Sequence, residues 1–176
     1  MKTKSRTEHI LTALYVLAWI AFVGFLVEAG ALLLSYVISC INPDGAKNLY
    51  KGFNLNSDRN MSLWYNTMSV SFLIALAVMK AYVWYYVIRI LSKINMVNPF
   101  TTDVAQMLER ISHLLLSAWI VAMLSGAQAH WLSKTTGDDY HGVPSGDFLF
   151  MAALVFVISQ VFKRGVEIQS ENDLTI

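Results

Sequence analysis

Four long runs of apolar residues constrain the fold of this chain more than any other feature of its sequence. They cover about residues 10–38, 64–90, 111–132 and 147–163. A helix needs about 20 apolar residues to cross the hydrocarbon core of a bilayer. Charged residues make up only 14% of the chain, against about 25% in a typical soluble domain. The sequence therefore predicts an all-α integral membrane bundle of four transmembrane helices, in one domain covering residues 1–176.

The placement of Lys and Arg outside these runs predicts the orientation of the helices. Basic residues of short loops accumulate on the cytoplasmic side of a membrane. Eight of them lie on one side, in the N-terminal segment and in or directly beside the connection over residues 91–110 and the tail over residues 164–176: Lys2, Lys4, Arg6, Arg89, Lys93, Arg110, Lys163 and Arg164. Four lie in the other two loops. We therefore expect both termini in the cytoplasm, with a cytoplasmic elbow at 91–110 and a cytoplasmic tail at 164–176.

The elbow carries the signals for the start of a helix. Asn98 and Pro99 interrupt the chain, and Thr101 or Thr102 is suited to cap the next helix, with Asp103 favourable in its first turn. Apolar residues then recur at helical spacing along one stripe, at Val104, Met107, Leu108, Ile111, Leu114 and Leu115. This pattern predicts that the third helix begins as an amphipathic segment at the membrane surface.

Composition and motifs exclude several classes of function. The net charge is +1, without the clustered basic face that a nucleic-acid-binding surface needs. The single cysteine, Cys40, excludes an internal disulfide and a multi-cysteine metal site. No nucleophile–base pair, phosphate-binding loop or zinc motif is found. We therefore expect no enzymatic activity, no cofactor and no metal.

The elbow and the tail together resemble a known family. The residues that carry the resemblance are Val97, Asn98, Pro99 and Phe100, the following helix with Arg110, and the end of the chain from Phe162 to Ile176. They resemble the family of domain of unknown function 2975, which comprises small bacterial four-span membrane proteins. Ile168 stands where a leucine is more usual. The family has no established catalytic residues, so none is carried over.

The resemblance also implies a location and a partner. It implies a multi-pass protein of the bacterial cytoplasmic membrane, in contact with the lipid bilayer. Members often occur beside a small helix-turn-helix regulator of the phage-repressor type, which implies that such a transcription regulator is a partner.

Two charged residues fall inside the apolar runs. Glu28 lies in the first run and Lys80 in the second, and a charge within a bilayer is costly unless it is paired or reaches water. Small residues near Glu28, including Gly24, predict that its face packs closely on another helix. The two charges could form a structural pair or line an ion or substrate pathway. Alternatively, Lys80 could extend towards the cytoplasmic side.

A stripe of small residues marks the third run. Ala118, Ala122 and Gly126 recur every four residues, which permits close helix–helix approach. The contact could form within the bundle or between protomers of a homo-oligomer.

Two functional interpretations remain from the sequence. The first is a non-enzymatic membrane protein that docks a cytoplasmic protein through its elbow and tail. The second is a small transporter or channel subunit that uses Glu28 and Lys80. In the first, the tail binds a partner or folds back on the elbow, with its acidic residues facing Arg89, Lys93 and Arg110. The candidate docking surface comprises Asn98, Pro99, Phe100, Arg110, Gly165, Glu171, Asp173, Leu174, Thr175 and Ile176.

Overall fold

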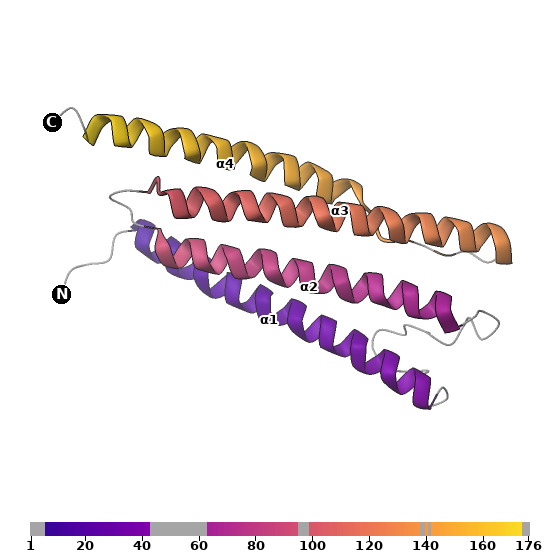
Figure 1. Ribbon diagram of the computed structural model, residues 1–176. Coiled ribbons are helices and arrows are strands. Elements are labelled where there is room, and N and C mark those ends of the chain that lie inside the picture. The colour runs from indigo at the N-terminus through magenta and orange to yellow at the C-terminus, as the bar shows by residue number, and fades with distance from the viewer. Residues whose placement is uncertain (1–5, 43–62, 95–98, 138–139, 141, 174–176) are drawn as a thin grey trace.

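The chain folds into four long helices. A computed structural model of the protein describes residues 6–42, 63–94, 99–137, 140 and 142–173. The helices are α1 (Arg6–Ile41), α2 (Leu63–Lys93), α3 (Thr102–Thr136) and α4 (Gly146–Asp173). They alternate in direction, so that α1 begins at the end of the molecule where α4 finishes (Figure 1). The predicted all-α bundle of four membrane-spanning helices is confirmed.

The four helices lie side by side in a row that follows their order in the chain. Among the described residues, α1 packs on α2, α2 on α3 and α3 on α4, and no backbone contacts join helices that are not consecutive (Figure 1). The hydroxyl groups of Tyr36 and Thr67 are 2.6 Å apart and join α1 to α2. Gln128 of α3 donates to the backbone carbonyl of Tyr65 in α2, at 3.1 Å. Because α1 has a single neighbour, most of its surface remains open to lipid.

The helices are longer than a membrane is thick. Helix α1 has 36 residues and α3 has 35, so each is about 50 Å long at ~1.5 Å per residue. The hydrocarbon core of a bilayer measures only about 30 Å. All four helices are long and apolar enough to cross a membrane, and the ends of the longer ones must project beyond it. The chain is thus a multi-pass membrane protein.

The core of the row lies where α2, α3 and the start of α4 meet. Leu76, Ala118 and Ala122 are buried there, and Val143 and Phe148 pack against them together with Met79 and Val121. The small-residue stripe of α3 therefore packs inside this chain. A Cβ atom added at Gly142 would overlap the Cα of Gly126. These two glycines thus let the segment before α4 lie directly on the backbone of α3.

Helix α4 begins beside the middle of α3 and extends past the elbow (Figure 1). The apolar run over residues 147–163 is shorter than a full crossing, but α4 continues beyond it, so that Gly146–Glu171 is long and apolar enough to cross a membrane. The backbone N–H of Tyr140 donates to the Ser133 hydroxyl at 2.9 Å, which helps to hold Tyr140 against the end of α3.

We predict that residue 50 and the C-terminus lie on opposite sides of the membrane, with the C-terminus in the cytoplasm. Four antiparallel helices and the surplus of Lys and Arg at the elbow and tail lead to this arrangement. Topology reporters fused at residue 50 and after residue 176 measure it. Reporters that mark the same side would contradict four crossings, and an external C-terminus would contradict the charge argument.

Candidate functional site

The elbow and the end of α4 meet at one end of the row. The Phe100 ring lies against Phe162, with 5.2 Å between the ring centroids. A Cβ atom added at Gly165 would come within 2.5 Å of the Phe100 ring. Only glycine therefore leaves room for the ring against α4. The two segments that carried the family resemblance are thus joined by one aromatic contact across 65 residues of sequence.

The start of α3 positions this ring. Thr101 is the N-cap residue, and its hydroxyl accepts a 3.3 Å hydrogen bond from the backbone N–H of Val104. This bond satisfies one of the amide groups that a helix start leaves unpaired. Val104 and Ala105 are 1% exposed, so the first turn is anchored in the protein. Phe100, directly before the cap, is therefore held at a defined place over α4.

Three ion pairs surround this contact. Lys93 of α2 binds Asp103 at 2.6 Å, and Lys163 of α4 binds Glu109 of α3 at 2.9 Å. The third pair, Arg164–Glu167, lies within α4 at 2.6 Å. The first two pairs link three consecutive helices. All the side chains involved are partly exposed, so water screens each pair and its contribution to stability is small.

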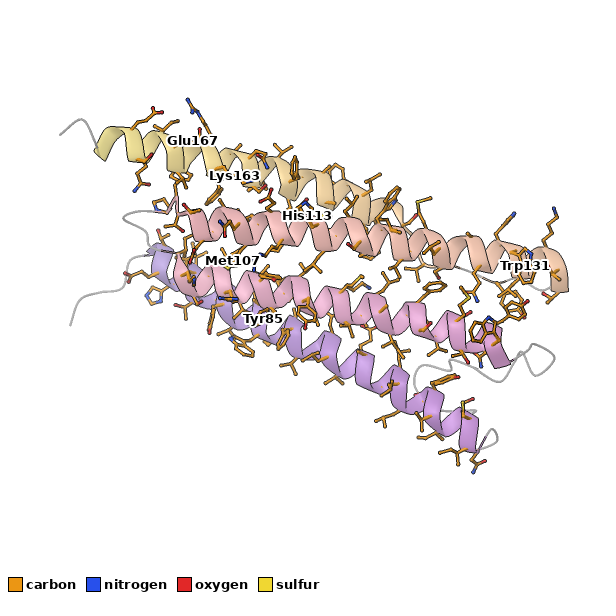
Figure 2. All side chains as sticks on the ribbon, viewed as in Figure 1. Tyr85, Met107, His113, Trp131, Lys163 and Glu167 are labelled. Carbon is orange, nitrogen blue, oxygen red and sulfur yellow. The ribbon has the colours of Figure 1, made fainter. Side chains whose placement is uncertain are left out.

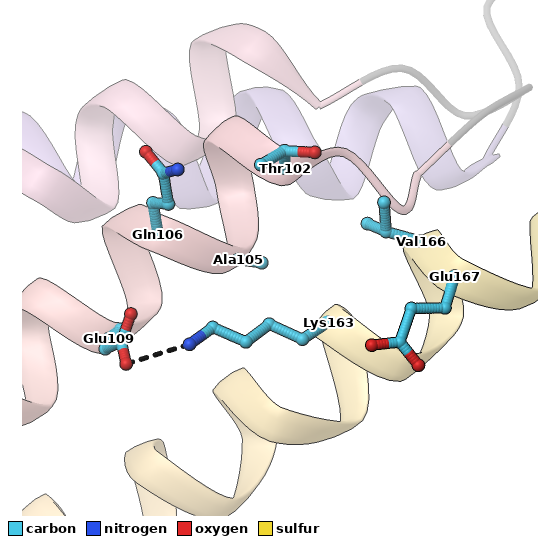
Figure 3. A pocket seen from close by; sticks show the side chains of 7 residues that line it. All are labelled: Thr102, Ala105, Gln106, Glu109, Lys163, Val166 and Glu167. Carbon is cyan, nitrogen blue, oxygen red and sulfur yellow. Dashed lines mark hydrogen bonds and ion pairs between the residues drawn. The ribbon is translucent and has the colours of Figure 1, made fainter. Parts of the chain in front are cut away.

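A hollow of about 320 Å³ opens between α3 and α4 beside the Phe100 contact. It is lined by Thr102, Ala105, Gln106, Glu109, Lys163, Val166 and Glu167. Figure 3 shows the Lys163–Glu109 pair crossing between the two helices at this hollow. We call the hollow together with Phe100 and Gly165 the elbow site. It offers an apolar floor with polar side chains above it, which suits the binding of a protein segment.

The ion pairs keep the carboxylates at this end charged. The hydrogen bond and the charge of Lys93 lower the pKa of Asp103, and the charge of Arg89 lowers it further. The hydrogen bond from Lys163 lowers the pKa of Glu109. Both groups lie at the projecting end of α3, before the apolar run that begins at residue 111. The rim of the elbow site therefore carries fixed charges of both signs near neutral pH.

The structure brings some of the expected docking residues together. Phe100 and Gly165 meet at the elbow site, and Pro99 directly precedes Phe100 in the chain, whereas Arg110 is exposed on α3 and does not line the hollow. Glu171 is exposed near the end of α4, and Asp173 is the last residue of that helix. The remaining expected residues lie outside the described part of the chain: Asn98, Leu174, Thr175 and Ile176.

The charge pairing expected for the tail was wrong in detail. Glu167 pairs with Arg164 of its own helix rather than with a cation of the elbow, and Lys93 pairs with Asp103. The reason is that residues 164–173 continue α4 as a helix, which points Glu167 away from α2. The contact between elbow and tail is made instead by the Phe100 ring and by the Glu109–Lys163 pair.

Sequence reasoning missed Gln106, Glu109 and Lys163 as site residues. Glu109 and Lys163 are opposite charges at the elbow-side ends of consecutive antiparallel spans, so they lie at similar depth. These opposite charges at similar depth were visible in the sequence. The sequence did not indicate how α3 is rotated about its axis, which is what turns Gln106 and Glu109 towards α4.

The structure does not bring Glu28 and Lys80 together. The Lys80 ammonium lies 5.6 Å from the centre of the Phe25 ring and 5.8 Å from that of Phe148. Such cation–π contacts stabilise a charge in an apolar setting. Both residues are described, and no ion pair joins them. Glu28 lies three residues after Phe25, which places it about 4.5 Å further along the axis of α1.

The close packing expected beside Glu28 is also absent. A Cβ atom added at Gly24 would have no atom within 4 Å. The buried stripe of α1 instead passes through Ala18, Ala29 and Leu32. Glu28 itself is half-buried at the flank of that stripe. The expectation therefore fails at Gly24, whereas Ser35 of the same expected face is buried. Helix α1 has only one neighbour, so only one stripe of it is buried, and that stripe includes the branched Leu32.

Comparison with known proteins identifies one match. The family model described as protein of unknown function, DUF2975, matches residues 42–176. No curated protein and no solved structure matches the chain.

We predict that Gly165→Val destabilises the protein by about 1–3 kcal/mol, because the added side chain displaces the Phe100 ring. In a Phe100→Ala background the same change should cost much less, since the ring is already gone. Thermal unfolding in detergent of the two single variants and the double variant measures this coupling. Gly24→Val, at an open position of α1, is the matched control. Equal losses in both backgrounds would show that Phe100 does not occupy this place.

We also predict that Glu28→Gln and Lys80→Met change stability additively, because the two side chains do not meet. Independent sites usually add to within about 0.5 kcal/mol. The measurement is the unfolding temperature of both single variants and the double variant. A double variant that recovers much of the single losses would instead reveal an ion pair.

Proposed function

This chain belongs to the DUF2975 family of proteins of unknown function, and we propose that it is a non-enzymatic membrane protein that docks a cytoplasmic protein at its elbow site. The proposal carries with it residence in a bacterial cytoplasmic membrane with the elbow inside the cell. The first partner to test is the helix-turn-helix regulator that the resemblance implies. Docking at a membrane would remove such a regulator from DNA.

The observation that carries this proposal is the hollow between α3 and α4. Its floor includes Ala105, which is 1% exposed, and the half-buried Val166. Its rim includes the exposed Gln106 and the exposed Glu167, which is bound by Arg164 of its own helix. An apolar floor under a polar rim is the usual anatomy of a protein interface. The opening lies at the projecting end of the helices, where a water-soluble partner can reach it.

A continuous helical face enlarges the surface next to the hollow. Helix α4 continues past Gly165 to Asp173. Ile168 on this extension is 47% exposed, beside the carboxylate of Glu167. Ile168 does not line the hollow, so a partner would cover this isoleucine only by extending from the hollow onto the outer face of α4. Burying an isoleucine contributes about 1.5–3 kcal/mol, whereas the exposed charges mainly determine orientation and specificity.

We predict that one cytoplasmic protein crosslinks in cells to photoreactive residues placed at Gln106 and at Glu167. Both positions are exposed around the hollow, and they lie on different helices. The same residue at Lys134, exposed at the opposite end of α3, is the matched control and should capture at least about tenfold less of that protein. Mass spectrometry identifies the captured protein.

Two further variants distinguish docking from general membrane proximity. Ile168→Ser and Glu167→Lys change the outer face of α4 without touching the Phe100 contact. Each should reduce the crosslink from Gln106 while the protein level stays unchanged. A crosslink that appears equally from Lys134, or none from either elbow position in a folded protein, would contradict the docking proposal.

A further inference from the structure

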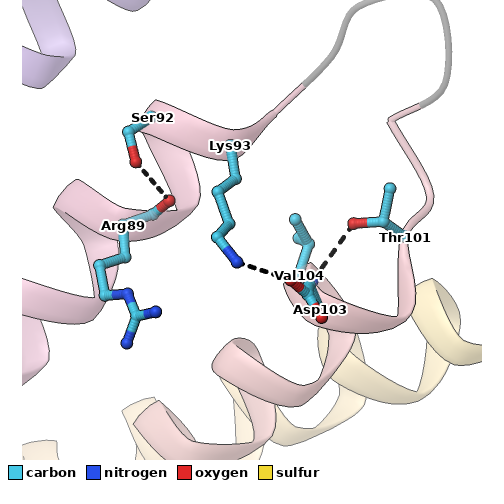
Figure 4. A network of polar contacts seen from close by, with 6 residues as sticks. All are labelled: Arg89, Ser92, Lys93, Thr101, Asp103 and Val104. Carbon is cyan, nitrogen blue, oxygen red and sulfur yellow. Dashed lines mark hydrogen bonds and ion pairs between the residues drawn. The ribbon is translucent and has the colours of Figure 1, made fainter.

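A second polar feature lies on the side of α3 that carries Asp103 and Arg110. These two residues are seven positions apart, which is two helical turns, so they share one face of α3. Lys93 of α2 binds Asp103 on this face at 2.6 Å. The charge of the Arg89 guanidinium also acts on Asp103. Figure 4 shows Arg89 and Lys93 on the same stretch of α2, with Lys93 reaching Asp103. We call Arg89, Lys93 and Arg110 the basic patch.

The patch has more positive charge than its surroundings neutralise. The one carboxylate that a cation of the patch binds in the described residues is Asp103, which is taken by Lys93. Glu109, the next carboxylate along α3, is bound by Lys163. Within the described residues, neither Arg89 nor Arg110 forms an ion pair. Two guanidinium groups thus remain available for an anion, and each presents several donors in a planar fork that matches phosphate oxygens.

The arginines sit at similar height. The Lys93–Asp103 pair sets the register of α2 against α3 at this end. Arg89 lies one helical turn from Lys93 towards the membrane, and Arg110 lies two turns from Asp103 in the same direction. The two arginines therefore differ in height by roughly one turn, about 5 Å. A single phosphate group lies within reach of both long side chains.

The two arginines lie along the helices at the level of the lipid headgroups. Arg89 lies one residue inside the elbow-side end of the second apolar run, and Arg110 directly precedes the third. Basic side chains at such boundaries extend their charged ends to the membrane surface. The Arg89 guanidinium lies 5.9 Å from the centre of the Tyr85 ring, a cation–π contact that orients it.

Exposed aromatic rings continue the patch into the membrane. Tyr82 is 54% exposed and Tyr85 is 40% exposed, both on α2 below Arg89. Figure 2 shows Tyr85 beside the elbow half of α2, near the level of Met107. Tyrosines at this depth belong to the aromatic belt that lies among headgroups and upper acyl chains. A soluble anion would not need these rings, whereas a lipid would use both the cations and the aromatic surface.

We propose that the basic patch binds the phosphate headgroup of an anionic phospholipid in the leaflet at the elbow end. The phosphate accepts hydrogen bonds from Arg89 and Arg110, Lys93 adds charge, and the acyl chains pass along Tyr82 and Tyr85. Neither arginine lines the hollow of the elbow site, although Gln106 of that hollow lies on α3 between Asp103 and Arg110. The lipid proposal rests on its own residues, so either proposal can fail without the other.

The test is a lipid titration of the purified full-length protein in non-ionic detergent. Thermal unfolding is followed as phosphatidylglycerol or phosphatidylcholine is added, and the half-saturating lipid concentration is determined. Phosphatidylglycerol should raise the unfolding temperature at a lower concentration than phosphatidylcholine does. Arg89→Gln and Arg110→Gln should each raise the half-saturating phosphatidylglycerol concentration about fivefold. Each basic side chain near an anionic membrane surface strengthens binding by about that factor. Lys134→Gln, at the opposite end of α3, should leave it unchanged.

Further arms separate the sources of the anion. Inorganic phosphate at the same concentration should not stabilise the protein. If it matches the lipid, the site takes a free anion and the lipid proposal is overturned. Equal effects of the two lipids on the wild-type protein, or full phosphatidylglycerol binding by both glutamine variants, would overturn it as well. If a glutamine variant does not fold, the salt dependence of lipid binding by the wild-type protein still tests the proposal. Its preference for phosphatidylglycerol must weaken in 0.5 M salt, where the Debye length is roughly 4 Å against about 30 Å at 0.01 M. A salt-independent preference contradicts the proposal.

Discussion

The structure depends on one constraint, which is that lipid offers no hydrogen bonds to the peptide backbone. Each crossing must therefore satisfy its own N–H and C=O groups, and a helix does so within a single segment. This constraint accounts for the four long helices. The last apolar run is shorter than a crossing, and α4 completes it by continuing as a helix. Gly142 and Gly126 bring the backbone before α4 directly onto α3.

The same constraint leaves the order of packing open, and here the helices form a row in chain order. Helix α1, the most apolar of the four, packs only on α2, so the rest of its surface faces lipid. Lys80 lies between Phe25 of α1 and Phe148 of α4, two rings from the outer helices of the row. Its charge is thus accommodated by aromatic faces rather than by Glu28.

The elbow end differs in kind from the rest of the molecule. Polar and charged side chains gather there because the helices project beyond the hydrocarbon core, and the Phe100 ring holds α3 and α4 together around Gly165. The ion pairs add orientation more than stability, since all are partly exposed. One face of this end presents a hollow with a polar rim, and another presents two arginines at headgroup height.

The sequence by itself determined the class of protein, the number of crossings and the importance of the elbow. Apolar runs of membrane length allow little besides helices, and Thr101 is recognisable as a helix cap from its position before Asp103 and Val104. Only the tertiary structure decided which faces meet. The expected packing at Gly24 and the expected pairing of Glu167 with the elbow both failed, because a periodic pattern does not state how far a helix is rotated about its axis. That rotation follows from side-chain packing between segments distant in the sequence, such as Phe100 on Gly165, and no local pattern contains it.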